Sequence, residues 1–86
     1  MDKKQMRIIP ICNNKAAILH NARKNKVYLF SYGLLIMSYD LSTGDYTRHI
    51  QDPQAITHTT MKHINEFACP QKFNLNTFFK LKYKRQ

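Results

Sequence analysis

The pattern of hydrophobic and polar positions divides the chain into strand-like segments, one helical segment and a final stretch of strict alternation. A first strand is expected at residues 6–11, where Pro10 restricts it to a sheet edge or a strand end because proline cannot donate to the ladder. Residues 15–20 fit either a strand or a helical turn. Residues 21–26 are polar and basic, which predicts a loop that carries positive charge.

Two consecutive hairpins are predicted in the middle of the chain. Residues 27–39 are rich in β-branched and aromatic side chains, and Gly33 permits a tight reversal between the two halves. Because neither half alternates cleanly with polar residues, we expect both strands to be central and covered by a helix on at least one face. A second hairpin is expected over residues 38–50, with Asp40 at the start of its turn and Gly44 at the end.

An amphipathic helix is predicted over residues 59–68. Hydroxyl side chains at positions 57, 59 and 60 can cap its start, and Pro70 ends it. A helical wheel separates an apolar side from a polar side. The apolar side holds Met61, Ile64, Phe67 and Ala68, and the polar side holds Thr59, Lys62, His63 and Glu66.

The C-terminal segment, residues 73–84, alternates apolar residues with asparagine and lysine. A period of two favours a strand, whereas a helix from Leu75 would leave Leu81 among lysines. As a strand, the segment would place Lys80, Lys82 and Lys84 on one face, about 7 Å apart, which is close to the phosphate spacing of a nucleic-acid strand.

These elements predict an α+β fold. A small antiparallel sheet, built from hairpins over about 27–39 and 38–50, is packed by one helix over about 59–68 and extended by a basic C-terminal strand. The length fits a single domain, residues 1–86. No apolar run reaches the roughly 20 residues of a membrane span, and no signal peptide is visible. We therefore expect a soluble protein of the cytoplasm.

The charge balance points to an anionic partner. The chain has 14 Lys and Arg against five Asp and Glu, a net charge of +9. Nucleic acid or an acidic protein surface fits this charge, and a membrane surface is disfavoured because no basic amphipathic helix is predicted. We expect nucleic acid to contact Arg23, Lys24, Lys26, Lys80, Lys82, Lys84 and Arg85. Tyrosines that can stack on unpaired bases are interleaved with them: Tyr28, Tyr32, Tyr39, Tyr46 and Tyr83.

No catalytic, metal or cofactor motif is recognisable, so we expect a binding protein without a cofactor. Cys12 and Cys69 lack the spacing of a disulfide framework or a zinc site, which favours free buried thiols. His58 and His63 are five residues apart, which does not place them on one helical face. The enzymatic alternative is a metal-independent ribonuclease with His63 or His49 as the base, because imidazole titrates near neutrality.

Three runs of the sequence are similar to one known group of proteins. They are VYLFSY at residues 27–32, IMSYD at 36–40 with the Thr43-Gly44 pair after it, and TTMKHINEF at 59–67. Together they resemble a family of small uncharacterised domains of phages, plasmids and other mobile elements of bacteria, marked by a tyrosine-bearing hairpin and a Thr-Thr-x-Lys-His-Ile-Asn helix.

The resemblance covers roughly residues 26–68 and leaves the basic segment 73–86 as an extension. Gly33 stands where such domains often carry a polar residue. The resemblance implies no activity, but it implies an accessory protein of a phage or mobile element in the bacterial cytoplasm.

Three functions compete at this point. The first is a nucleic-acid-binding module that grips phosphates, with DNA or RNA left open. The second is a stoichiometric inhibitor of a host defence enzyme, similar to an anti-CRISPR protein, that docks through Thr59, Lys62, His63 and Asn65. The third is a small ribonuclease toxin. The apolar hairpin also makes a homodimer plausible.

Overall fold

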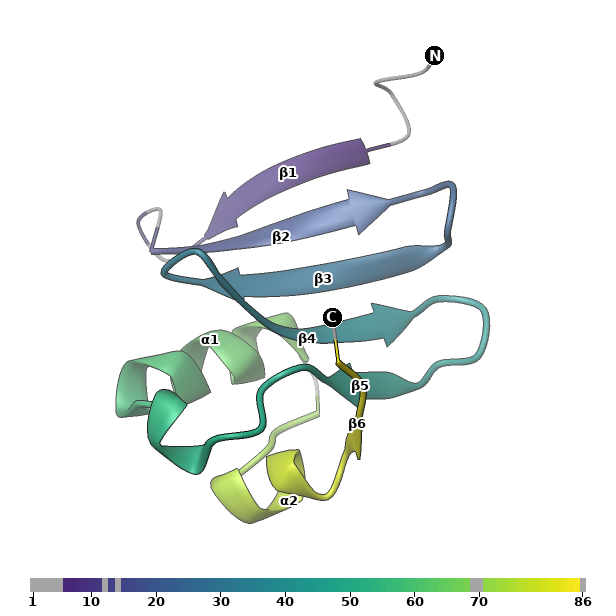
Figure 1. Ribbon diagram of the computed structural model, residues 1–86. Coiled ribbons are helices and arrows are strands. Elements are labelled where there is room, and N and C mark those ends of the chain that lie inside the picture. The colour runs from purple at the N-terminus through teal and green to yellow at the C-terminus, as the bar shows by residue number, and fades with distance from the viewer. Residues whose placement is uncertain (1–5, 12, 14, 69–70, 86) are drawn as a thin grey trace.

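The computed structural model describes residues 6–11, 13, 15–68 and 71–85 and contains one sheet with helices on one side (Figure 1). The strands follow one another in the sheet in chain order, and all neighbours are antiparallel except β5 and β6, which are parallel. This arrangement confirms the predicted α+β class. The strands are β1 (Met6–Ile11), β2 (Ala16–Asn21), β3 (Lys26–Ser31), β4 (Leu34–Asp40), β5 (Tyr46–Arg48) and β6 (Lys82–Tyr83).

The predicted N-terminal edge strand is confirmed as β1, and the ambiguous segment after it is the strand β2. Pro10 lies opposite Ala17 of β2. The backbone N–H of Tyr32 donates to the carbonyl of Lys15 at 2.8 Å, so the backbone polar groups of Lys15 point toward β3. In an antiparallel sheet every second residue of a strand bonds to the same neighbour, so the N–H and C=O of Ala17 also point toward β3. The backbone of Pro10 therefore faces the free edge, where its missing N–H removes a donor that another strand would use.

Both predicted hairpins are confirmed. Tyr32 and Gly33 connect β3 to β4 with φ values of 52° and 81°. A two-residue turn needs positive φ at both positions to match the twist of the strands that it joins. In the second hairpin the carboxylate of Asp40 accepts from the N–H of Ser42 at 2.8 Å. Gly44, with φ of 79°, closes this turn by donating to the carbonyl of Asp40 at 2.7 Å.

The helix α1 (His58–Phe67) confirms the predicted helix to within one residue at each end. Thr57 caps it, because its hydroxyl accepts from the N–H of Thr60 at 3.1 Å. A short 3-10 helix, η2 (Pro53–Ala55), precedes it. The predictions for Pro70, Cys12 and Cys69 fall outside the described residues.

The predicted C-terminal strand is wrong for most of its length. Residues 75–79 form the helix α2 (Leu75–Phe79), and only Lys82 and Tyr83 are extended, as β6. The side chain of Asn74 accepts from the N–H of Thr77 at 2.7 Å and so begins a helix. Phe78, which a strand would have turned away from the other aromatic residues, is fully buried.

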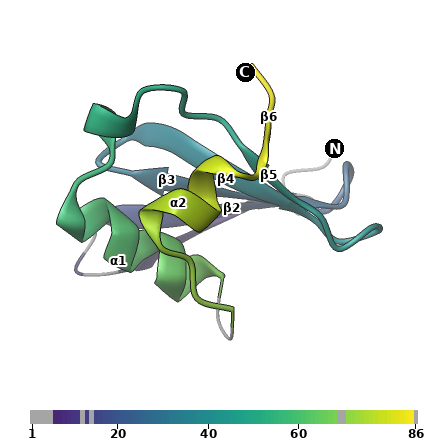
Figure 2. The ribbon, with the colours of Figure 1, turned by 90° about the horizontal axis from the view of Figure 1, so that it is seen from below.

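The sheet has a covered face and an open face. Register places Ile18, Leu29 and Met37 on the covered face, where Ile64 of α1 and Phe78 of α2 complete the core. Figure 2 shows α1 on this side of the sheet and the chain after β6 rising on the other side. Two short helices therefore bury one face and leave the other open.

A polar contact lies within this core. Ser31 Oγ of β3 and His63 Nδ1 of α1 are hydrogen-bonded at 2.8 Å, and the ring of Tyr32 lies 5.7 Å from the imidazole. Burial lowers the pKa of His63, and the positive charge of Lys15 lowers it further. The placement of His63 on the outer side of the helix was wrong, because with Thr60 and Ile64 it completes the stripe that faces the sheet.

The buried histidine predicts a pH dependence of stability. Because the pKa of His63 is lower in the folded protein than in the unfolded chain, the unfolded chain binds more protons below about pH 6.5. The free energy of unfolding should then fall by up to about 1.4 kcal/mol per pH unit, measured by urea denaturation between about pH 7.5 and 5.5. His63→Gln should lose this dependence, whereas His58→Gln, at an exposed position of the same helix, should retain it.

The burial of Phe78 predicts that the C-terminal segment is part of the core. Phe78→Ala should lower the free energy of unfolding by about 3–5 kcal/mol or prevent folding, because it leaves a cavity between α2 and the sheet. The matched control is Leu75→Ala in the same helix, at a side chain that is 43% exposed. This control should cost less than about 1 kcal/mol in the same denaturation experiment. Equal stability of the two variants would contradict the packing of α2.

Candidate nucleic-acid interface

A basic hollow lies on the open face, where the loop before β3 meets the C-terminal residues. Its volume is about 360 Å³, and four of its lining side chains are cationic while none is an Asp or Glu. The cations come from two segments that are far apart in the sequence. The hollow is lined by Lys24, Lys26, Tyr28, Leu35, Ser38, Thr47, His49, Lys84 and Arg85.

The loop that carries Lys24 is held in place by its own asparagines. Asn21 Oδ1 accepts from the N–H of Lys24 at 3.3 Å, and Asn25 adopts a φ of 59° that lets the loop reverse. The side-chain amide of Asn25 donates to Ser42 Oγ at 3.0 Å, and its carbonyl accepts from the N–H of Leu41 at 2.9 Å. These hydrogen bonds connect the loop to the next hairpin and so fix the positions of the loop's lysines.

The C-terminal residues are fastened to the open face by His49. The N–H of Lys84 donates to the carbonyl of Arg48 at 2.9 Å, and His49 Nδ1 donates to the carbonyl of Lys84 at 2.9 Å. The other ring nitrogen, Nε2, is hydrogen-bonded to Ser38 Oγ at 2.9 Å. Because a carbonyl can only accept, Nδ1 carries the proton in neutral His49, and Nε2 then accepts from the Ser38 hydroxyl. His49 therefore positions Lys84 beside the loop.

Arg48 joins the C-terminal segment to the sheet from the covered face. Its guanidinium lies 4.9 Å from the ring centre of Phe79 and 5.1 Å from that of Tyr83, and it donates to the carbonyl of Ile50 at 2.6 Å. These contacts connect β5 to α2 and β6. The charge of Arg48 serves the fold and does not line the basic hollow.

A second polar hollow, of about 460 Å³, adjoins the first and has mixed charge. It is lined by Asp40 and Asp45 as well as Lys26 and Lys82. The N–H of Ser42 lowers the pKa of Asp40, and the positive charge of Lys26 contributes in the same direction, so Asp40 is ionised at neutral pH. An anionic ligand is therefore favoured in the basic hollow over the hollow beside it, where two carboxylates offset two lysines.

The structure brings together part of the predicted nucleic-acid site. Lys24, Lys26, Lys84 and Arg85 line one hollow, whereas Lys82 lines the mixed one. Arg23 is exposed in the same loop as Lys24 without lining the hollow. The expected ladder through Lys80, Lys82 and Lys84 is wrong, because Lys80 lies at the helical C-cap position of α2 and only Lys82 and Tyr83 are extended.

The residues proposed for the alternative helix interface do not share one exposed face. Thr59 and Lys62 are exposed, but His63 is buried against Ser31. The side chain of Asn65 is engaged with the fold, because its Oδ1 accepts from the N–H of Phe73 at 2.6 Å. His63, a candidate base of the ribonuclease alternative, is 2% exposed in the core.

The tyrosines also divide between the two faces. Tyr39 and Tyr46 pack together at 4.7 Å on the covered face, and Tyr46 contacts the ring of Phe73 at 5.4 Å. Tyr83 lies on Arg48, and Tyr32 is 61% exposed at the tip of its turn. Tyr28 faces the basic hollow, where its ring lies 6.5 Å from that of His49.

The sequence reasoning missed the part that Ser38 and His49 play in building the hollow. A usable signal was present, since strand alternation places Thr47 and His49 on the same face, and pairing of β3 with β4 sets Tyr28 opposite Ser38. The fixing of the C-terminal residues by His49 had no local signal. It depends on a contact between residues 35 positions apart.

The described residues contain no helix of the length and apolar character that a membrane span requires. They also contain no group of three or more His, Cys, Asp or Glu side chains that could hold a metal ion.

The chain matches no family model, no curated protein and no solved structure. The resemblance to domains of phages and mobile elements stays an expectation.

Proposed function

We propose that this protein binds nucleic acid and that the basic hollow grips the phosphate backbone. The observation that carries the proposal is the convergence of Lys24, Lys84 and Arg85, all exposed, on a hollow whose lining has no carboxylate. Since no acidic side chain of the hollow neutralises them, these cations are free to attract an external anion. Binding is proposed to proceed without catalysis.

A polyanion suits this arrangement better than a single anion. The net charge of +9 attracts any negative ligand, but only a chain of phosphates gains from several cations set side by side. Arg85 can form paired hydrogen bonds with one phosphate, while the lysines act as point charges on its neighbours. The loop and the C-terminal residues are held by backbone hydrogen bonds, so the cations are arranged before the ligand arrives.

The biological setting that we propose follows the resemblance of residues 26–68 to domains of phages and mobile elements. An accessory protein of such an element, at work in the bacterial cytoplasm, would meet both DNA and RNA. Contacts to phosphate alone carry no sequence information, so the basic hollow by itself supports binding without base specificity.

Removal of charge from the hollow should weaken binding much more than removal of the same charge elsewhere. The test variant replaces Lys24, Lys84 and Arg85 with Gln, and the control replaces Lys62, Lys72 and Lys80, which are also exposed but do not line the hollow. By fluorescence anisotropy with labelled oligonucleotides, the test variant should lose about tenfold or more in affinity near 100 mM salt. Its plot of log affinity against log salt should also become shallower by about 2.

The control variant makes this experiment decisive because both triples lower the net charge equally. If the two variants lose the same affinity, the binding arises from overall charge and the hollow is not its site. If the wild-type protein binds no oligonucleotide even near 50 mM salt, the proposed function is wrong.

A further inference from the structure

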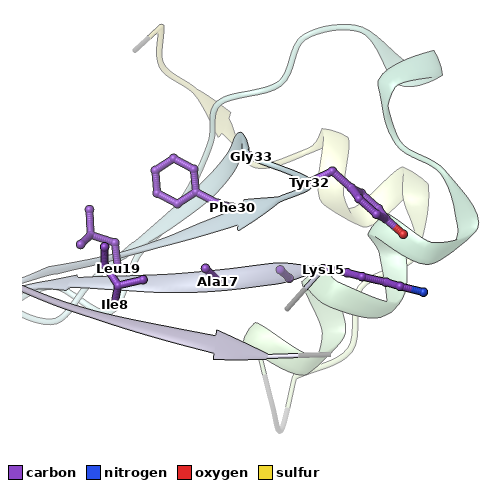
Figure 3. Close-up of a pocket in the computed structure, with 8 residues that line it drawn as sticks. Ile8, Lys15, Ala17, Leu19, Phe30, Tyr32 and Gly33 are labelled. Carbon is purple, nitrogen blue, oxygen red and sulfur yellow. The ribbon is translucent and has the colours of Figure 1, made fainter. Parts of the chain in front are cut away.

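The open face holds a further hollow, distinct from the basic and the mixed one, that the phosphate contacts do not use. It is apolar, has a volume of about 520 Å³ and lies over β1, β2 and β3 and the turn after β3 (Figure 3). Several of its side chains are unusually accessible, with Ile8 70% and Tyr32 61% exposed. Its lining consists of Ile8, Lys15, Ala16, Ala17, Leu19, Phe30, Tyr32 and Gly33.

The apolar hollow and the basic hollow adjoin each other on β3. Tyr28 lines the basic hollow and Phe30 the apolar one. These two residues lie two positions apart on one strand, so their side chains point to the same face from Cα atoms about 7 Å apart. Figure 3 shows the side chains of Phe30 and Leu19 on the same side of the sheet. A ligand that extends from one hollow therefore passes directly over the other.

The open face thus offers aromatic rings and apolar surface beside clustered cations. Lys15 adds a further exposed cation at the far end of the apolar hollow, next to Tyr32. A ligand that complements these neighbouring cations and rings has a negatively charged backbone and flat apolar groups at regular intervals. Unpaired nucleotides have this chemistry, whereas a duplex keeps the faces of its bases stacked inside and offers only phosphates to a sheet.

We infer that the nucleic acid bound by this protein is single-stranded, with its phosphates on the basic hollow and its bases stacked on Tyr28, Phe30 and the apolar hollow. This inference rests on the proposed function and specifies its ligand. It also assigns Tyr28 and Phe30 as the residues that distinguish a single strand from a duplex.

A second copy of this chain is a poorer occupant of the open face. Two such faces in contact would bring together two basic hollows on molecules that each carry a net charge of +9, and these would repel. Pairing through the free edge of β1 is also hindered, because Pro10 offers no N–H there. The charge of the open face therefore favours a polyanionic ligand, and the edge chemistry disfavours a second copy.

The test compares ligands that carry the same number of phosphates. Labelled single strands of DNA and RNA, about 12 nucleotides long, are titrated beside a duplex of that length and a strand in which most positions are abasic. The wild-type protein should bind the single strands about tenfold or more tightly than the abasic strand, and more tightly than the duplex. This comparison needs no variant and so does not depend on whether a substitution disturbs folding.

Variants then assign the effect to the rings. Phe30→Leu and Tyr28→Leu keep apolar bulk but remove the aromatic face, so each should lose about tenfold on the single strands and little on the abasic strand. Tyr28→Phe keeps the ring, so it should restore the preference for the single strands over the abasic strand that Tyr28→Leu loses. Unfolding curves of all three confirm that the compared proteins are folded.

The outcomes separate this inference from the proposed function. Equal affinity of the wild type for single, abasic and duplex ligands would overturn the inference and leave binding to phosphate intact. Absence of binding to all of them near 50 mM salt would overturn the proposed function and the inference together. The apolar hollow would then be a candidate contact for a protein partner.

Discussion

A six-stranded sheet has two faces, and the helices of this small domain can cover only one of them. The ten residues of α1 and the five of α2 lie on the same side, where Ile64 and Phe78 are completely buried against the sheet. Packing on this side holds the domain together, including the buried hydrogen bond between Ser31 and His63. Because the stabilising contacts lie on the covered face, the side chains of the open face are not needed to form the core.

The open face shows the consequence of that division. Its strands carry Leu19 and Phe30 at positions where the sheet meets no second layer, and basic residues surround them at one end. His49 matters here because it fastens the C-terminal residues to this face instead of leaving them free. A few hydrogen bonds thereby hold several of the cations together at one place on the open face. This place lies next to apolar surface of the kind that bases contact.

The local elements were largely predictable because their signals are short-range. The reversal at Gly33, the turn from Asp40 and the hydroxyl cap before α1 each depend on residues within four positions of one another. The segment around Phe78 was mispredicted as strand because alternation and a short helix fit its apolar residues almost equally well. The choice was made by the Asn74 cap and by the space that the sheet offers for an aromatic ring.

By itself, the sequence determined the positive charge, the α+β class, the two hairpins and the helix over residues 59–68, since composition and local periodicity carry this information. It also identified Lys24, Lys26, Lys84 and Arg85 as candidate contacts, though not as one group. Only the tertiary structure decided that these four meet, that His63 lies inside and that one face of the sheet stays open. These outcomes depend on contacts between distant residues, which form only when the helices dock and the C-terminal residues pair with β5, and no local pattern encodes them.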